Sequence, residues 1–156
     1  MSAIAVIGCG NLARGDDGVG PRVVRALSQR ALGGDPRVRL LDAGTDGMAV
    51  MFAARGCRRL IIIDAARAGA APGAVFEVPG RELENRAAPS LTLHDFRWDH
   101  ALYAGRRLYG EAFPPAVTVL LVEAASTDFS LELSPAVAEA VHKVADRVER
   151  LVREAA

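Results

Sequence analysis

Apolar residues along the chain alternate between short continuous runs and stretches spaced three or four positions apart. The continuous runs predict buried strands, and the spaced stretches predict helices with one apolar face. The expected strands cover residues 3–8, 38–44, 59–66, 72–80 and 116–124. The expected helices begin near Gly20, cover 47–54 and 94–108, and extend from Ser134 towards the last residue. This alternation predicts one α/β domain over residues 1–156, a twisted, mostly parallel five-stranded sheet with helices on both faces.

The composition of single elements predicts where they lie. The segment 59–66, "RLIIIDAA", is the most apolar strand and is expected at the centre of the sheet. Prolines flank residues 72–80, which favours a position near an edge. The inward face of the helix over 94–108 is expected to consist of Trp98, Ala101, Leu102 and Leu108. The first helix is expected to bury Gly20, Val23, Val24, Leu27 and Ala31.

Residues 8–24, "GCGNLARGDDGVGPRVV", contain a glycine pattern that is typical of nucleotide-binding loops. A G-x-G-x-x-A run follows the first strand, and Asp42 ends the second, which is the outline of a dinucleotide fingerprint. That fingerprint requires a helix to begin within the glycines. A helix starting near Gly10 would include Pro21, and an internal proline costs ~3 kcal/mol. We therefore expect the helix to begin near Pro21, and the dinucleotide-binding module is the less favoured alternative.

Several acidic residues lie at strand ends, where parallel sheets bind their ligands. Asp16 and Asp17 precede a helix, where acids can simply stabilise the helix dipole by ~0.3–1 kcal/mol. Asp64 ends the apolar run "LIII", where a carboxylate either has a function or caps the following turn. Because Asp17 and Asp64 end neighbouring units, we expect them to converge above the sheet.

The chain has three histidines, and their expected positions differ. His94 stands at a loop-to-helix junction, whereas His100 is expected to pack or face solvent within a helix and His142 to lie at the surface. One histidine with two carboxylates suits a divalent transition metal with open coordination positions. Asp17, Asp64 and His94 are therefore the candidate metal ligands.

Cysteine usage and charge exclude several other classes. Cys9 could be a nucleophile, but a buried small residue is the favoured interpretation. Cys9 and Cys57 form neither a C-x-x-C pair nor a disulfide framework. A formal net charge of zero disfavours a nucleic-acid partner. The start "MSAIAVIG" lacks the pattern of a signal peptide, and no apolar run reaches the ~18 residues of a membrane span, so a cytoplasmic protein is expected.

The motifs and their order resemble those of the nickel–iron hydrogenase maturation proteases, over nearly the whole chain. "VIGCGNLARGDDGVGPRVVRAL" has the G-x-G-N and D-[DE]-G-x-G of that family. Four later segments are similar to its second strand, third-strand Asp, His segment and C-terminal helix start, namely "LLDAGTDGM", "LIIIDAA", "LTLHDFRWDHAL" and "SLELSPAVAEAV".

The resemblance implies an endopeptidase that removes a short C-terminal extension from a hydrogenase large-subunit precursor after nickel insertion. We expect it to act as a monomer. It assigns the metal-contacting and catalytic site to Asp17, Asp64 and His94, with Asp16 as an auxiliary candidate. The nickel is expected to be carried by the precursor, and no nucleotide is expected. A non-catalytic dinucleotide- or nickel-binding α/β module is the alternative function.

Three segments depart from the family pattern. Arg97-Trp98 replaces a Gly-Leu pair after the histidine, and Ala43 replaces a glycine in "DAGT". The segment "VEAASTDFSLELSP" lacks the usual Glu-Pro-Glu-Ser run. Because Arg97-Trp98 lies close to His94, this departure is expected to change the shape of the site or the choice of substrate.

Overall fold

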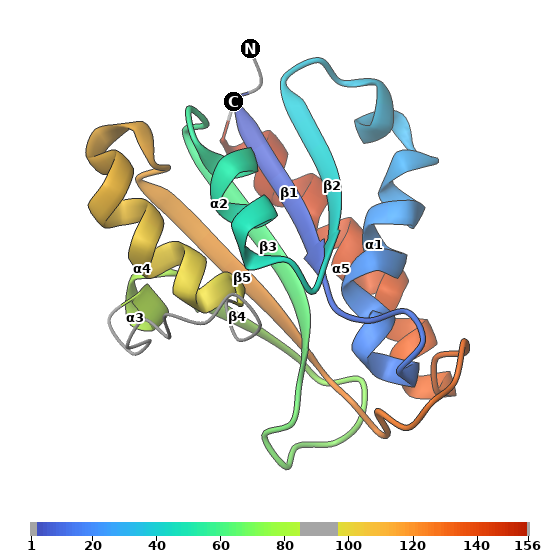
Figure 1. Ribbon diagram of the computed structural model, residues 1–156. Coiled ribbons are helices and arrows are strands. Elements are labelled where there is room, and N and C mark those ends of the chain that lie inside the picture. Colours follow the sequence, from blue (N-terminus) through green and yellow to red (C-terminus); the bar gives the residue numbers. More distant parts are fainter. Residues whose placement is uncertain (1–2, 85–96, 156) are drawn as a thin grey trace.

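The computed structural model describes residues 3–84 and 97–155 (Figure 1). Within these ranges the strands are β1 (Ile4–Cys9), β2 (Val38–Gly44), β3 (Arg59–Ala66), β4 (Val75–Pro79) and β5 (Ala116–Glu123). They form one five-stranded sheet of order β2-β1-β3-β5-β4. Neighbouring strands are parallel except β4, which runs antiparallel to β5. The mostly parallel sheet, the central position of β3 and the edge position of β4 are confirmed.

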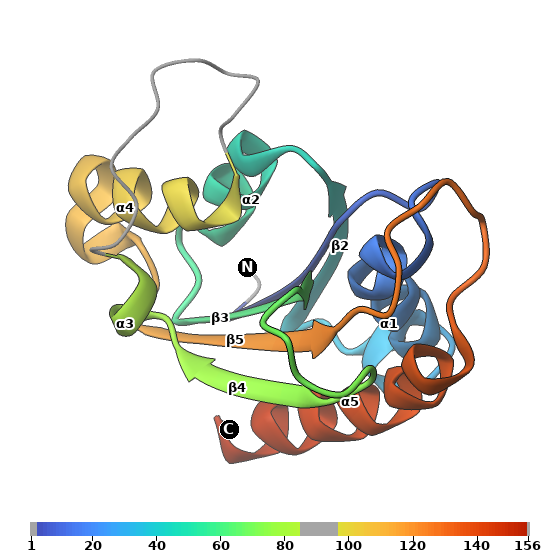
Figure 2. The ribbon, with the colours of Figure 1, turned by 90° about the horizontal axis from the view of Figure 1, so that it is seen from below.

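Helices cover both faces of the sheet, as Figure 2 shows. One face carries α1 (Val19–Ser28) and α5 (Pro135–Glu154), and the other carries α2 (Gly47–Ala54) and α4 (Trp98–Tyr109). Shorter turns of helix are α3 (Arg81–Glu84), η1 (Gly15–Gly18), η2 (Ala31–Gly34) and η4 (Gly110–Ala112). Each pair of helices encloses its own apolar cluster against the sheet. No helix in the described ranges is long and apolar enough to cross a membrane.

The segment between β1 and α1 is a loop, as the proline argument predicted. Helix α1 begins at Val19, so Pro21 lies in its first turn, where a missing backbone N–H breaks no intrahelical bond. Asp16 and Asp17 lie in η1, just before the helix. Because no helix starts near Gly10, the geometry that a dinucleotide fingerprint requires is missing.

The start of α1 rests directly on the sheet. A Cβ atom at Gly20 would lie 2.4 Å from the carbonyl oxygens of both Cys9 and Ile63. Only glycine permits this approach without displacing backbone. The close contact places η1, and the acids in it, beside the carboxyl ends of β1 and β3.

Two inward-facing predictions were wrong. Leu108 is 69% exposed, because Phe113 folds back against Gly105 and fills the core at that level of α4. Ala31 is exposed in η2, because α1 already ends at Ser28 and the chain buries Leu32 instead.

Candidate active site

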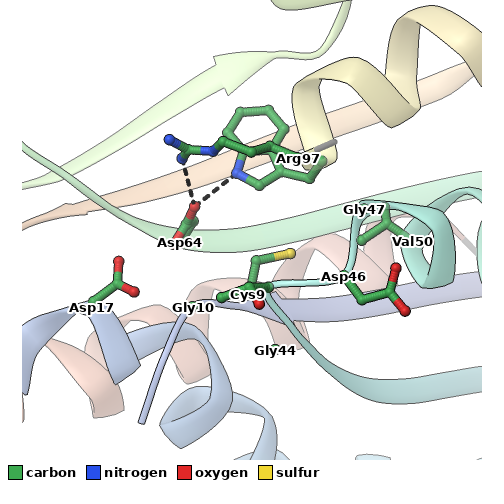
Figure 3. Close-up of a pocket in the computed structure, with 11 residues that line it drawn as sticks. Cys9, Gly10, Asp17, Gly44, Asp46, Gly47, Val50, Asp64 and Arg97 are labelled. Atoms are coloured by element: carbon green, nitrogen blue, oxygen red, sulfur yellow. Dashed lines mark hydrogen bonds and ion pairs between the residues drawn. The ribbon is translucent and has the colours of Figure 1, made fainter. Parts of the chain in front are cut away.

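A cavity of about 280 Å³ opens at the carboxyl ends of β1 and β3 (Figure 3). Segments far apart in the sequence line it: the end of β1, η1, the residues before α2, the end of β3 and the start of α4. The chemically reactive side chains in its wall are Cys9, Asp17, Asp46, Asp64 and Arg97, together with the indole of Trp98. The site therefore lies where ligands bind in parallel α/β sheets.

Asp64 is the most deeply buried acid in the cavity wall, with a side chain that is 6% exposed. Its Oδ1 atom accepts a hydrogen bond of 2.8 Å from the backbone N–H of Ala65. Its Oδ2 atom accepts a hydrogen bond of 2.7 Å from the indole Nε1–H of Trp98. The Nη2 atom of Arg97 lies 3.6 Å from the same Oδ2 atom. These contacts thus fix the orientation of the Asp64 carboxylate.

The environment of Asp64 raises its pKa to about 6. Burial is the main cause, because it removes the charged form from water, and the negative charge of Asp17 adds to it. The hydrogen bonds from Trp98 and Ala65 and the positive charge of Arg97 oppose the rise. Asp64 can therefore gain or lose a proton close to neutral pH.

Asp17 reaches the cavity from η1 and is partly buried. Its Oδ2 atom accepts a hydrogen bond of 2.8 Å from the backbone N–H of Asn11. Gly10 lies between the two acids with φ of 133°. A Cβ atom there would be 1.8 Å from the carbonyl oxygen of Asp17 and 3.5 Å from Oδ1 of Asp64. The structure thus brings Asp17 and Asp64 to one cavity across a glycine that no larger residue could replace without moving η1.

Asp16 has a different environment, although it is the neighbour of Asp17. It is 1% exposed and does not line the cavity. Its carboxylate accepts hydrogen bonds from the backbone N–H groups of Ala125, Ser126 and Ser134 and from the Ser134 hydroxyl, at 2.7–3.3 Å. Burial alone would raise the pKa of Asp16, but these hydrogen bonds outweigh it and hold the pKa below the ordinary value. In this position Asp16 joins η1 to the segment before α5.

The expectations for the three histidines compare differently with the structure. His94, the third candidate ligand, lies outside the described residues. His100 stands in the first turn of α4 rather than mid-helix, where its Nδ1 atom accepts a hydrogen bond of 3.1 Å from the backbone N–H of Arg97. His142 is exposed on α5, as expected.

Cys9 lines the cavity but is only 5% exposed. Burial, helped by the negative charge of Asp64, raises the pKa of its thiol far above the ordinary value. A thiol that stays protonated is a poor nucleophile. The favoured interpretation, a buried small residue, agrees with this environment.

Comparison with known proteins identifies the family of this chain. A family model described as hydrogenase maturation protease matches residues 21–151. The chain belongs to this family. The hydrogenase 2 maturation protease of Escherichia coli is 31% identical over 152 residues, which are 97% of this chain and 91% of the relative. This family membership makes the chain a peptidase that acts in hydrogenase maturation, and nothing supports the non-catalytic alternative.

Solved structures of this family have the same fold. The hydrogenase maturating endopeptidase HybD from Escherichia coli has a TM-score of 0.81 at 27% identity, covering 99% of this chain and 94% of that one. The hydrogenase 2 maturation peptidase from Thaumarchaeota archaeon SCGC_AB-539-E09 has a TM-score of 0.74 at 30% identity, covering 97% and 98%. The α/β endopeptidase fold therefore extends over nearly the whole chain.

Among the cavity-wall residues that were not predicted as site residues are two charged side chains and one aromatic one. Arg97 and Trp98 were noted as a departure from the family pattern, and the structure places both on Asp64. Asp46 caps α2, where its Oδ1 atom accepts hydrogen bonds from the backbone N–H groups of Met48 and Ala49. The N-cap preference for Asp before an apolar helix could have located Asp46.

The described residues supply part of a metal site. No group of three or more His, Cys, Asp or Glu side chains among them is arranged to hold a metal ion. Asp17 and Asp64 provide two carboxylates beside one cavity, a donor type that binds divalent cations. A metal centre carried by another protein would bring its own remaining ligands, so two carboxylates fit contact with such a centre.

Proposed function

We propose that this chain recognises a nickel-loaded hydrogenase large-subunit precursor and removes its C-terminal extension by hydrolysis. The family membership supports the peptidase class and the role in hydrogenase maturation. The observation that carries the proposed site is the pairing of Asp17 and Asp64 at one cavity, 47 positions apart in the sequence. In this proposal both carboxylates contact the nickel of the precursor, with His94 as the third contact.

Two routes to hydrolysis fit this arrangement. In the first, the acids hold the nickel of the precursor next to the scissile carbonyl, which the metal polarises. In the second, of the aspartic type, Asp64 takes a proton from the attacking water and delivers it to the leaving amine as the C–N bond breaks. Both routes require Asp64 to be deprotonated before water attacks, and the pKa of about 6 makes that form available at neutral pH.

The test is cleavage of the precursor by purified variants. Asp17→Asn and Asp64→Asn keep the side-chain volume and are expected to lower cleavage of a nickel-loaded precursor by at least about 100-fold. Asp146→Asn is the matched control, because Asp146 is 58% exposed on α5. Helix α5 covers the face of the sheet opposite to α2 and α4 (Figure 2). A nickel-free precursor is expected to stay uncut by the wild-type enzyme. Wild-type rates in either cavity variant would overturn the assignment.

We further infer that the enzyme works as a monomer in the cytoplasm. Cys9 and Cys57 are both buried and unpaired, which suits a reducing compartment. Size-exclusion chromatography with light scattering measures the oligomeric state, and a stable dimer at micromolar concentration would contradict the monomer. Fractionation of the source cells would test the compartment.

A further inference from the structure

The Oδ2 atom of Asp64 has two partners from the start of α4, one hydrogen-bond donor and one cation. The indole N–H of Trp98 donates to it at 2.7 Å, and the guanidinium of Arg97 lies at 3.6 Å (Figure 3). The side chain of Arg97 is 65% exposed, whereas that of Asp64 is 6% exposed. A largely exposed cation therefore lies over the most buried acid of the cavity wall.

We propose that Arg97 is a displaceable cover of Asp64: it competes with free divalent cations for this carboxylate and gives way to the metal centre of the precursor. The inference rests on the proposed function, because it assumes that Asp64 contacts the nickel of the precursor. In this role Arg97 determines specificity, because it favours the metal centre of the precursor over free divalent cations.

Electrostatics requires the competition. A divalent cation that approaches Oδ2 of Asp64 meets the positive charge of Arg97 at the same atom, and two like charges at such short range repel each other. Either the cation stays out or the guanidinium moves away. A free hydrated ion gains only the contact with the acids, whereas a precursor also binds through its polypeptide, and that additional binding energy can displace the guanidinium.

The Arg97 side chain can move away from Asp64, whereas packing holds the Trp98 side chain in place. The Arg97 side chain is 65% exposed and its guanidinium lies 3.6 Å from Oδ2, beyond hydrogen-bond distance, so moving it fully into water breaks no hydrogen bond to Asp64 and costs little. Trp98 is 8% exposed and packs in the apolar cluster beneath α2 and α4. Its indole N–H therefore keeps Oδ2 oriented while Arg97 moves. Trp98 is also the one tryptophan of the chain, so its fluorescence reports on Asp64 directly.

The test titrates nickel(II) alone into purified enzyme, by equilibrium dialysis and by quenching of Trp98 fluorescence. Arg97→Gln removes the charge and is expected to tighten nickel binding about tenfold. Arg97→Lys keeps the charge and is expected to stay within about twofold of wild type. Arg150→Gln makes the same change of charge at an exposed position near the end of α5 and is expected to bind as wild type. Melting temperatures of all variants are expected to be unchanged.

A competition assay tests the second half of the proposal. Free nickel(II) is expected to inhibit cleavage of the precursor by Arg97→Gln at about tenfold lower concentration than it inhibits wild type. Equal nickel affinity in wild type and Arg97→Gln would overturn the inference. Asp64→Asn separates the two proposals: if it abolishes nickel binding while Arg97→Gln binds as wild type, the inference alone fails. If Asp64→Asn binds nickel as wild type, or no variant binds nickel, the metal contact at Asp64 fails as well, and the inference fails with it.

Discussion

At the scale of single residues, Asp64 is a buried carboxylate, and burial disfavours its charged form. Its pKa rises from the ordinary 3.8 to about 6, so the folded state binds its proton more tightly than the unfolded chain does. The contribution of Asp64 to the free energy of unfolding is therefore fully present below the unfolded pKa of 3.8 and is lost as pH rises through about 6. The rise in pKa corresponds to about 3 kcal/mol at neutral pH, and shifts of this kind concentrate at functional sites.

Replacing Asp64 by Asn should therefore stabilise the fold at high pH. At pH 8 we expect Asp64→Asn to raise the free energy of unfolding by about 1–3 kcal/mol, because an amide carries no buried charge and its oxygen can still accept from Trp98. Near pH 4 most of the gain should disappear, since wild-type Asp64 is then protonated in the folded state and carries no buried charge. Urea unfolding at the two pH values measures the difference. An equal loss of stability at both would mean that Asp64 is a structural cap.

The same pKa predicts the pH profile of the enzyme. Cleavage, measured as kcat/KM for a nickel-loaded precursor, should fall about tenfold for each pH unit below about 6, as Asp64 becomes protonated. Trp98→Phe removes an N–H donor that lowers the pKa of Asp64, so its profile should shift to higher pH. Circular dichroism at each pH verifies that the fold persists. A profile that is flat between pH 5 and 7 would exclude Asp64 from the reaction.

At the scale of elements, a single buried acid joins two segments that are distant in sequence. Asp16 in η1 accepts hydrogen bonds from Ala125, Ser126 and Ser134, which lie between β5 and the start of α5. The depressed pKa of Asp16 means that its contribution is present above the unfolded value and is lost as pH falls through the lower folded value. The bonds hold η1 in place, and with it the neighbouring Asp17.

Asp16→Asn tests this role. The amide can accept part of these hydrogen bonds, but its NH₂ group faces backbone donors, so we expect a loss of about 2–4 kcal/mol in the free energy of unfolding at pH 7. Asp128→Asn, at an exposed position of the same segment, is expected to change stability by less than about 0.5 kcal/mol. Thermal melts and cleavage below the melting temperature are measured together. Loss of cleavage with an unchanged melting temperature would instead show that Asp16 takes part in the reaction.

At the scale of the whole molecule, two apolar clusters share one sheet. One lies beneath α1 and α5, the other beneath α2 and α4, and the side chains of β3 alternate between them. Leu27 belongs to the first and Trp98 to the second, and both are buried. Because β3 is part of both clusters, the two faces should unfold together.

Leu27→Ala is therefore expected to lower the stability of both faces. Removing this fully buried side chain should cost about 2–5 kcal/mol. Trp98 fluorescence, which reports on the other face, should show the same reduced melting temperature as far-ultraviolet circular dichroism. Two separate transitions, with the Trp98 signal unchanged from wild type, would show that the faces unfold independently.

Local patterns in the sequence were sufficient for most of the architecture. Periodicity identified the strands and main helices of the described ranges, and the apolar run of β3 placed it at the sheet centre. Pro21 located the start of α1 to within two residues, because proline is excluded from helix interiors. The acids Asp17 and Asp64 were found because strand ends meet at one edge of a parallel sheet. Apart from the strand-end rule, which follows from the parallel topology, these rules depend on residues near one another in the chain.

The tertiary structure alone decided what depends on contacts between distant residues. It turned Asp17 towards the cavity and Asp16 towards the start of α5, although the two are adjacent. It placed Phe113 where Leu108 was expected, because the chain after α4 folds back over Gly105. It also brought Arg97 and Trp98 onto Asp64, more than thirty positions away. Periodicity identifies which face of an element is buried, but only packing determines which partner each side chain meets there.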